Sequence, residues 1–459
     1  GLNVAVAATP LWHDALPEVA RRRDPLDGDR SADVVIVGGG FTGLWTAYSL
    51  LRRNPARTVV VLEAHTVGAG ASGRNGGWCS ALLPMGLDAI AAASSRSDAV
   101  RFQRVMFDTV DEVARVVETE QIGCGFHKGG TIELARSELQ WRRAQAHVEH
   151  LEAYGLDHVR LLGPDEVTAL MRATAVRGAT FTPHCAALDP TRLVHGLADA
   201  VERAGGIVHE NTPVREIRQG AAVTASGTIR SSVVLRATEA FTSSLPGQRR
   251  TVAPIHSLMI ATEPLPDHVW DEIGLADRPT FTDGRHMVIY GQRTQDGRLA
   301  FGGRGAPYHF GNSLDPRHDQ NPDVHAGLHR TLREMFPSIG DAAITHRWGG
   351  AVAAARDWWC SVAFDRATGL GHAGGYVGDG VGTSNLAGRT LADLVDGADS
   401  DLATLPWVGH RSRRWEPEPL RWLGINTMVR LTESIDRHEE RRGTGARMRS
   451  AVLDRFVGG

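Results

Sequence analysis

A glycine-rich turn between two apolar runs constrains the fold of this chain more than any other feature. In DVVIVGGGFTGLWTAYSLL (33–51), the spacing Gly38-x-Gly40-x-x-Gly43 predicts a buried strand, a tight turn and a helix. Glycines at these positions permit the turn, the approach of a pyrophosphate to the backbone, and close packing of helix on strand. A second apolar run, TVVVL, leads into Glu63, about 20 residues after the third glycine, where an acid can bind a ribose hydroxyl. The pattern therefore predicts a dinucleotide-binding βαβ unit.

The composition is that of a globular chain with room for more than one hydrophobic core. Of its 459 residues, 42% are hydrophobic and 22% are charged, and the formal net charge is −3. This charge gives no electrostatic reason to expect a nucleic-acid partner. No apolar run reaches the length of a membrane span, so we expect no membrane role either.

The cysteines argue against a metal centre. Cys79, Cys124, Cys185 and Cys360 are far apart and form no C-x-x-C pair. This spacing disfavours a zinc site, a dithiol redox centre and a disulfide framework. We therefore expect no metal and a reducing, cytoplasmic environment.

The order of the predicted elements indicates that the dinucleotide-binding domain is discontinuous. Apolar residues recur at helical spacing over 90–119 and 137–154. Short β-rich runs separated by turns cover 251–303, which predicts an antiparallel sheet. A glycine-rich strand, turn and helix then return at 371–395. The antiparallel sheet is therefore expected as an insertion.

Three separated motifs together resemble the D-amino-acid-oxidase-like superfamily of FAD-dependent oxidoreductases, near its glycine and sarcosine oxidase and gamma-glutamylputrescine oxidoreductase branch. They are the turn at 38–43 with Glu63, the loop GAGASGRNGGW (68–78), and GYVGDGVGTSNLAGRTLADL (375–394). The resemblance covers 33–395. It implies an α/β fold with a discontinuous Rossmann-like FAD-binding domain and an inserted α+β substrate domain built on an antiparallel sheet.

The resemblance also implies domain boundaries. They are an N-terminal arm, 1–32; an FAD-binding domain, 33–88, 156–240 and 356–398; a substrate domain, 89–155 and 241–355; and a C-terminal helical tail, 399–459.

The expected cofactor is FAD, held without a covalent bond. Some members of the family attach the flavin through a histidine in the second motif, where this chain has Arg74 and Asn75. Others use a cysteine upstream of the third motif, but Cys360 has a different spacing. The residues expected to bind the cofactor are Gly38, Gly40, Phe41, Thr42, Gly43, Glu63, Ala64, Gly70, Ala71, Ser72, Arg74, Asn75, Gly76, Gly77, Val214, Thr238, Gly350, Gly378, Asp379, Gly380, Val381, Gly382 and Thr383.

Three residues are expected to carry the chemistry. Asp379 is either a carboxylate that attracts an ammonium substrate or a helix-capping residue. Tyr290 either faces the substrate or packs in the core of a strand. Arg74 either pairs with an anion or is a solvent-exposed loop residue.

The resemblance implies oxidation of the C–N bond of a primary or secondary amine to an imine, by hydride transfer to flavin and then hydrolysis. Gly382 stands where sarcosine oxidases clamp the substrate carboxylate with lysine, which favours an amine over an amino acid. Ala300 stands where they place a lysine that promotes reaction with oxygen. Alternatives are a small amino acid oxidase of glycine or sarcosine type, an amine dehydrogenase that reduces a carrier instead of oxygen, and a non-catalytic flavoprotein.

Overall fold

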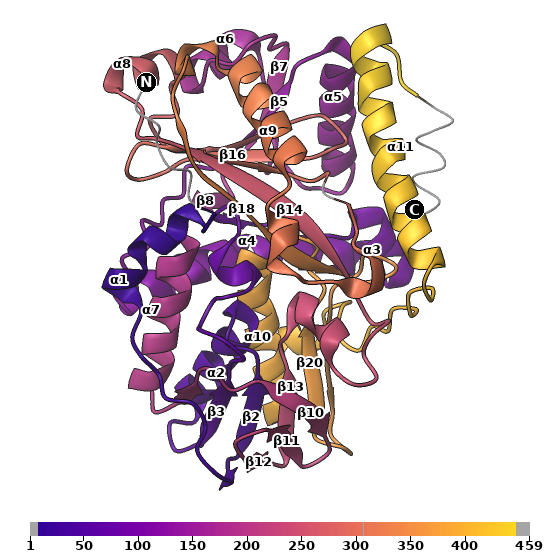
Figure 1. Cartoon of the computed structure of the whole chain (residues 1–459). Coiled ribbons are helices and arrows are strands. Elements are labelled where there is room, and N and C mark those ends of the chain that lie inside the picture. Colours follow the sequence, from indigo (N-terminus) through magenta and orange to yellow (C-terminus); the bar gives the residue numbers. More distant parts are fainter. Residues whose placement is uncertain (1–7, 306, 447–459) are drawn as a thin grey trace.

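The computed structural model describes residues 8–305 and 307–446, and it contains two large sheets, one above the other in Figure 1. The ends of the expected arm (1–7) and tail (447–459) lie outside the described residues. The lower sheet has the order β19-β20-β13-β2-β3-β9, and all its pairs are parallel except β19–β20. Its strands are β2 (Val34–Val37), β3 (Val59–Leu62), β9 (Ile207–His209), β13 (Val233–Arg236), β19 (Ser361–Asp365) and β20 (Leu370–Gly374).

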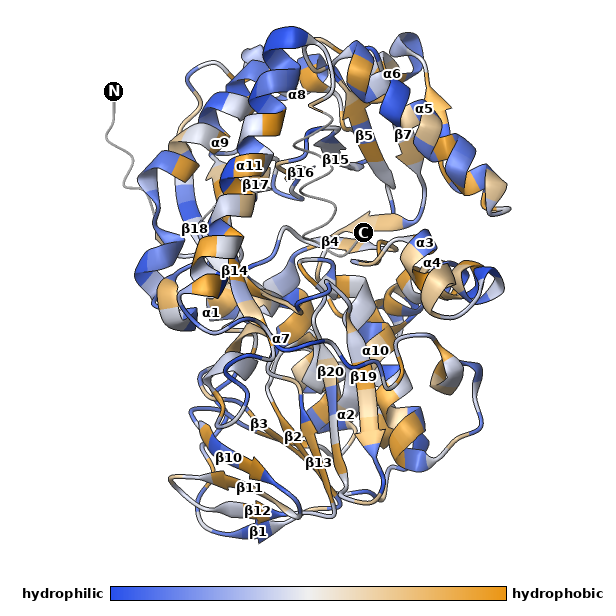
Figure 2. Ribbon diagram, turned by 90° about the vertical axis from the view of Figure 1, so that its right-hand side faces the viewer, coloured by the Kyte–Doolittle hydropathy of each residue, from blue (hydrophilic) through white to orange (hydrophobic). Residues whose placement is uncertain are grey.

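The lower sheet forms because its short strands are apolar on both faces. Val34 and Ile36 belong to a core shared with helices, whereas Val35 and Val37 face a small β-meander. The helices of that core are α2 (Phe41–Arg53), α3 (Leu87–Ala93), α4 (Arg96–Thr119), α7 (Pro190–Arg203) and α10 (Gly380–Asp396). The meander is β1 (Arg30–Ser31), β10 (Val214–Arg218), β11 (Ala221–Thr224) and β12 (Thr228–Arg230). Figure 2 shows the lower strands as mainly hydrophobic.

The upper sheet has eight strands in the order β18-β14-β17-β16-β15-β5-β7-β6, and its pairs are antiparallel except β15–β5. The strands are β5 (Thr131–Ala135), β6 (Arg160–Leu162), β7 (Gly178–Thr182), β14 (Ala253–Thr262), β15 (Thr280–Asp283), β16 (Ile289–Arg293), β17 (Leu299–Gly303) and β18 (Ile344–Ala354). Its helices are α5 (Glu138–Ala153), α6 (Pro164–Leu170), α8 (Asp267–Ile273) and α9 (Pro322–Met335). A two-stranded ladder of β4 (Trp78–Ser80) and β8 (Cys185–Ala187) completes the sheets.

The predicted fold class is therefore confirmed, but two groups of elements lie elsewhere than the expected boundaries place them. Strands β6 and β7, expected in the FAD-binding part, pair in the upper sheet. Helix α4, expected in the substrate part, buries Phe102 and Met106 in the core of the lower sheet. Hydrophobic periodicity identifies the buried face of an element, but it does not say which sheet covers that face.

The N-terminal arm is more deeply packed than its polar sequence predicts. After η1 (Leu11–Ala15) and α1 (Leu16–Val19), it runs along α7. The Trp12 side chain is buried, its indole N–H donates to the carbonyl of Asn75 at 2.8 Å, and its ring meets Trp348 edge-on. The arm therefore holds the loop after β3.

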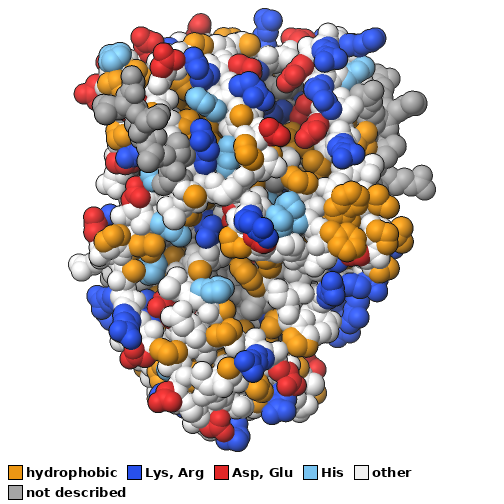
Figure 3. Space-filling model, viewed as in Figure 1, with side chains coloured by type: hydrophobic (Ala, Val, Ile, Leu, Met, Phe, Trp, Pro, Cys, Tyr) orange, Lys and Arg blue, Asp and Glu red, His pale blue; other side chains and the backbone are white. Residues whose placement is uncertain are grey.

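The long helix α11 (Leu420–Arg442) lies beside the upper sheet, at the right of Figure 1. Charges of both signs are mixed over the face shown in Figure 3, and an apolar patch lies near the lower end of α11. Leu420, Trp422 and Leu423, at the beginning of this helix, have exposed side chains.

Candidate functional site

The glycine turn after β2 opens on a cavity, here called the nucleotide cavity. It lies where β2 and β3 end, and the lining includes the first turn of α2, the loop after β3 and the segment after β13. This is the edge of a parallel sheet where ligands bind. The residues expected to bind the cofactor that line it are Gly38, Gly40, Phe41, Thr42, Glu63, Ala64, Gly70, Ala71, Ser72, Val214 and Thr238.

The turn fits a bound pyrophosphate because side chains are excluded where the backbone must come close. Gly38 has φ +115°, and a Cβ there would lie 2.2 Å from the carbonyl oxygen of Ala237. A Cβ on Gly43 would lie 2.0 Å from the carbonyl oxygen of Gly38. The N-cap Gly40 offers no side chain to the first turn of α2, so an anion can approach it; of its amides, that of Phe41 donates to Ser72 Oγ at 2.9 Å.

Glu63 lies beside this turn with its carboxylate held in place. Its Oε2 accepts the N–H of Gly39 at 2.7 Å, and its Oε1 accepts the N–H of His65 at 2.9 Å. Burial raises the pKa of Glu63, while these two N–H donors lower it. The arrangement points the acid at the nucleotide cavity, as expected for an acid that binds ribose hydroxyls.

A second cavity, the inter-sheet cavity, adjoins the first. Ala71 lines both, and Ala351 of the first stands between Gly350 and Val352 of the second. The beginning of α10 forms one wall of this cavity and β16 forms another. The expected site residues that line it are Ala71, Arg74, Asn75, Gly76, Tyr290, Gly350, Gly378, Asp379 and Val381.

Asp379 is the N-cap residue of α10, yet its side chain makes no capping hydrogen bond. Its carboxylate has no hydrogen-bond or ion-pair partner among residues 8–305 and 307–446. Burial raises the pKa of Asp379 to about 6, and the positive charge of Arg304 opposes this shift. The structure therefore disagrees with the simple capping interpretation and leaves a carboxylate facing the cavity.

Tyr290 projects from β16 into the same cavity. Its hydroxyl lies 2.7 Å from Ser257 Oγ, which also donates to the carbonyl of Gly303 at 3.2 Å. The Ser257 proton is therefore directed at Gly303, and the Tyr290 hydroxyl acts as the donor to Ser257. Burial raises the pKa of Tyr290, so its hydroxyl stays protonated at neutral pH.

Arg74 lies at the edge of the inter-sheet cavity with its guanidinium already engaged. It donates to the carbonyl of Ala69 at 2.9 Å and to the carbonyl of Gly349 at 3.2 Å, and it lies 3.4 Å from Asp319 Oδ2. These contacts tie the loop after β3 to β18. The guanidinium is therefore partly buried, and its Nε and Nη1 are both engaged.

Five expected cofactor residues line neither cavity and contribute to the packing behind the walls. They are Gly43, Gly77, Gly380, Gly382 and Thr383. A Cβ on Gly382 would lie 2.6 Å from the carbonyl oxygen of Ser80, so no side chain can project from this position. Thr383 donates its hydroxyl to the carbonyl of Asp379 at 2.5 Å.

Two functional residues were missed by reasoning from sequence. Glu133, on β5, lines the inter-sheet cavity and also a third, outer cavity. Glu239 accepts the N–H groups of Gly375, Tyr376 and Ala353, and so holds the turn before α10. The alternation of TIELA is a signal that marks Glu133 as a polar residue within a strand, but it does not indicate that this residue borders a cavity.

Ala300, expected at the position of the family's oxygen-promoting lysine, lines neither the nucleotide cavity nor the inter-sheet cavity. Its side chain is fully buried in a cluster with Trp12, Met259 and Trp348, because the N-terminal arm covers this part of the sheet. Cys360 is also buried, with its Sγ 3.6 Å from Met85 Sδ, and burial raises the pKa of its thiol. This packing fits the expectation that Cys360 does not carry the flavin.

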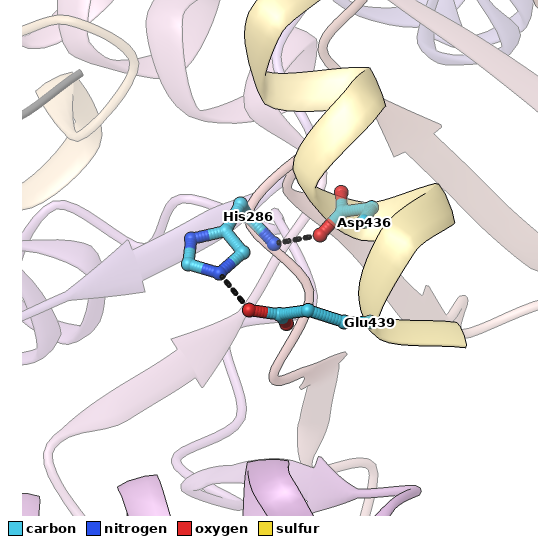
Figure 4. Close-up of side chains that lie close together, drawn as sticks. All are labelled: His286, Asp436 and Glu439. Carbon is cyan, nitrogen blue, oxygen red and sulfur yellow. Dashed lines mark hydrogen bonds and ion pairs between the residues drawn. The ribbon is translucent and has the colours of Figure 1, made fainter. Parts of the chain in front are cut away.

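One group of potential metal ligands lies between α11 and the loop after β15 (Figure 4). His286 Nε2 lies 3.2 Å from Glu439 Oε1, and Asp436 accepts the backbone N–H groups of His286 and Met287. The guanidinium of Arg143 binds both Glu439 oxygens at 3.0 and 2.8 Å. Arg143 neutralises the Glu439 carboxylate, and the backbone amides of His286 and Met287 bind Asp436. We therefore interpret this cluster as a set of structural contacts that attach α11 to the loop after β15.

The fold and the two adjoining cavities define a class of protein. The parallel sheet carries a dinucleotide turn, and its strands come from separate parts of the sequence. The cavity at this turn adjoins a second cavity, which borders a mainly antiparallel sheet. This arrangement is that of a flavin oxidoreductase with a cofactor part and a substrate part. In the part of the chain that the structure describes, no helix combines the length and the apolar character needed to cross a membrane.

Comparison with known proteins identifies the family. Residues 33–394 match the family described as FAD dependent oxidoreductase (DAO), and the chain belongs to this family. It is 33% identical over 408 residues to a probable oxidoreductase OrdL of Rhizobium meliloti, covering 86% of this chain and 90% of that protein. It is 28% identical over 403 residues to the gamma-glutamylputrescine oxidoreductase of Escherichia coli, covering 85% and 91%. This protein is therefore an FAD-dependent oxidoreductase.

A solved structure shares the fold. The glycine oxidase from Geobacillus kaustophilus superposes with a TM-score of 0.69 at 24% identity, covering 83% of this chain and 99% of that chain. The likeness covers most of this chain, so its fold is a known one.

Proposed function

We propose that this protein oxidises the C–N bond of a primary or secondary amine to an imine, which water then hydrolyses. The observation that carries this proposal is the unpartnered carboxylate of Asp379 in the inter-sheet cavity. A carboxylate in such surroundings binds an ammonium group. The gamma-glutamylputrescine oxidoreductase of Escherichia coli is among the relatives, which supports an amine as substrate.

The nucleotide cavity would hold FAD without a covalent bond, and the flavin would supply the acceptor for the hydride. Glu63 would hold the ribose, the first turn of α2 would hold the pyrophosphate, and the beginning of α10 would stand beside the flavin. These roles are supported by the residues that line the two cavities. We propose the expected boundaries of the FAD-binding and substrate domains with two changes. Strands β6 and β7 belong with the upper sheet, and helix α4 belongs with the lower sheet.

Asp379 positions the amine and receives its proton. Above pH 6 its carboxylate is ionised and accepts N–H bonds from the ammonium. Enclosure in the cavity and the nearby positive charge of Arg304 both favour the neutral amine, whose lone pair assists departure of the hydride. The ammonium proton passes to the Asp379 carboxylate and from there to solvent, and the C–H bond supplies the electron pair.

The charges around the cavity favour an amine over an amino acid. Arg285 is bound by Asp283 through two contacts of 2.8 Å, and Arg74 is engaged by Asp319 and two carbonyls. Among the described residues of the wall, Arg304 is the third cation, and it donates to the carbonyl of Val377 at 2.6 Å. A small amino acid remains the second candidate because Arg304 could bind its carboxylate.

A panel of substrates under anaerobic conditions tests the proposal. We expect alkyl amines and diamines to bleach the flavin absorbance faster than sarcosine or glycine, because the latter bring a carboxylate close to Asp379. Faster bleaching by sarcosine would establish the amino acid alternative. If no compound in the panel bleaches the flavin absorbance, the protein is a non-catalytic flavoprotein. Mixing the reduced protein with oxygen, and separately with a dye, then identifies oxygen or an electron carrier as the acceptor.

We expect Tyr290→Phe to lower kcat/KM for amines by about three- to tenfold, the effect of one lost hydrogen bond. The hydroxyl donates to Ser257, so its oxygen can accept the N–H of an amine. Steady-state kinetics and the FAD content measure the effect. Ser257→Ala is the matched variant, because it removes the partner and leaves the phenol. Unchanged kinetics in Tyr290→Phe would contradict a contact with substrate.

The outer cavity predicts a preference for long, doubly charged amines. It shares Trp78, Ser80, Leu82, Glu133 and Thr282 with the inter-sheet cavity. The Glu133 carboxylate has no hydrogen-bond or ion-pair partner among the described residues, and burial raises its pKa. A second ammonium group on the substrate would therefore find a carboxylate at the far end of the cavity.

We expect Glu133→Gln to raise KM for a linear diamine by about tenfold and to leave KM for a monoamine of equal length unchanged. Glu149→Gln, an exposed change on α5, is the control. An equal rise in KM for both substrates would show that Glu133 does not bind the second ammonium group of the diamine.

We also propose a reducing, cytoplasmic location. All four cysteines are free and buried, which supports a compartment where disulfides do not form.

A further inference from the structure

A fourth cavity, here called the arginine cavity, lies over the ends of two adjacent strands of the lower sheet. Its volume is about 460 Å³. Arg236 of β13 and His372 of β20, which are paired in register, lie on its floor, and the segment 410–414 forms part of its rim. The inter-sheet cavity shares no wall residue with it, whereas Glu239 lines both the arginine cavity and the nucleotide cavity.

Three arginines face this cavity without a carboxylate partner. Arg236 donates to Thr242 Oγ1 at 2.8 Å through one nitrogen, which leaves the other nitrogens of its guanidinium available. Arg411 and Arg414 make no ion pair or side-chain hydrogen bond with any residue in 8–305 or 307–446, and both are exposed at the rim. Burial lowers the pKa of Arg236 to about 10, so it stays charged at neutral pH.

The acid in the wall does not neutralise these arginines by direct contact. Among the described residues that line the cavity, Glu239 is the only acid. Its carboxylate accepts the N–H groups of Gly375 and Ala353 at 2.7 and 3.0 Å, and it is not within ion-pair distance of an arginine. His410 is likewise engaged, because its Nε2 lies 2.8 Å from Asp357 Oδ2. The cavity therefore has an excess of unpaired positive charge.

We propose that the arginine cavity binds a small metabolite with at least two anionic groups, either carboxylates or phosphates. Several cations around one concave site suit such a ligand, because guanidinium groups bind carboxylate and phosphate oxygens in the same way. A second anionic group is needed to engage the floor arginine and a rim arginine together.

Calorimetric titration of the FAD-loaded protein with citrate, and separately with pyrophosphate, tests the proposal at constant ionic strength. We expect saturable binding of one equivalent of at least one probe. Preference for citrate would identify a carboxylate ligand, and preference for pyrophosphate a phosphate ligand. Using the loaded protein keeps pyrophosphate out of the nucleotide cavity.

The double variant Arg411→Gln/Arg414→Gln should weaken binding of the preferred probe by at least about tenfold, because charge-assisted hydrogen bonds are lost. Both residues are exposed, so the fold should be unaffected. Arg413→Gln is the matched control: its side chain is 74% exposed, lies in the same segment, pairs with Glu416 and does not line the cavity. Absence of saturable binding, equal loss in the control, or unchanged binding in the double variant would each overturn the proposal.

Discussion

Gly43→Ala will purify with little or no FAD, with an affinity for FAD reduced by more than about tenfold. The added methyl group would lie 2.0 Å from the Gly38 carbonyl oxygen and 3.2 Å from Ile36 Cγ2. Helix α2 must therefore move away from β2, and its first amides leave the position where they bind the pyrophosphate. The ratio of flavin to protein absorbance, followed by titration with FAD, measures the loss.

Gly123→Ala is the control for this change. Gly123 is exposed, and a Cβ there would meet nothing within 4 Å. Circular dichroism separates a loss of cofactor from a loss of fold, because the variant is expected to keep its secondary structure. A Gly43→Ala protein that retains stoichiometric FAD would show that helix and strand need not pack so closely.

Asp379→Asn will raise KM for amines about ten- to a hundredfold at pH 8, while FAD remains bound. The wild-type carboxylate has a pKa of about 6, raised by burial. Its attraction for an ammonium group is therefore present above pH 6 and is lost as the pH falls through that value. In the wild type KM should rise at acid pH, whereas in the variant this rise should disappear. Steady-state kinetics from pH 5 to pH 8 measure both effects.

The stability of the amine-free protein provides a second test of Asp379. Because burial raises its pKa in the folded state, ionisation opposes folding, and stability should fall between roughly pH 4 and pH 6. Asp379→Asn removes that fall, so its melting temperature at pH 8 should be equal to or above that of the wild type. Asp399→Asn, an exposed change after α10, should alter neither KM nor stability. A destabilised Asp379→Asn protein would instead support a capping role.

The local geometry of the nucleotide turn was predictable because the physical reason acts within one short segment. Gly38 needs φ +115°, and Gly43 follows it by only five residues, so the spacing of the glycines in the sequence indicates the constraint directly. The apolar strands on either side are buried on both faces and therefore lack polar residues. Both properties can be read without knowing the rest of the fold.

The identity of the residues that face the substrate depends on contacts between distant segments. Ala300 and Tyr290 lie on neighbouring strands, yet the arm residue Trp12 covers the first and a cavity opens beside the second. Glu133 gains its place from the pairing of β5 with β15, which brings together residues about 150 positions apart. Local hydrophobic periodicity does not encode such pairings, because the same alternating pattern can be buried by any partner of suitable shape.

The sequence thus determined the dinucleotide turn, its acid and the two-part fold, because each depends on neighbouring residues or on a regular apolar pattern. Only the tertiary structure decided that Asp379 lacks a capping bond, that Arg74 is already engaged, and that three arginines meet in a separate cavity. Whether a charged group is paired depends on which distant segments the fold brings to it. Burial and pairing, in turn, decide which carboxylates and guanidinium groups are left to bind a ligand.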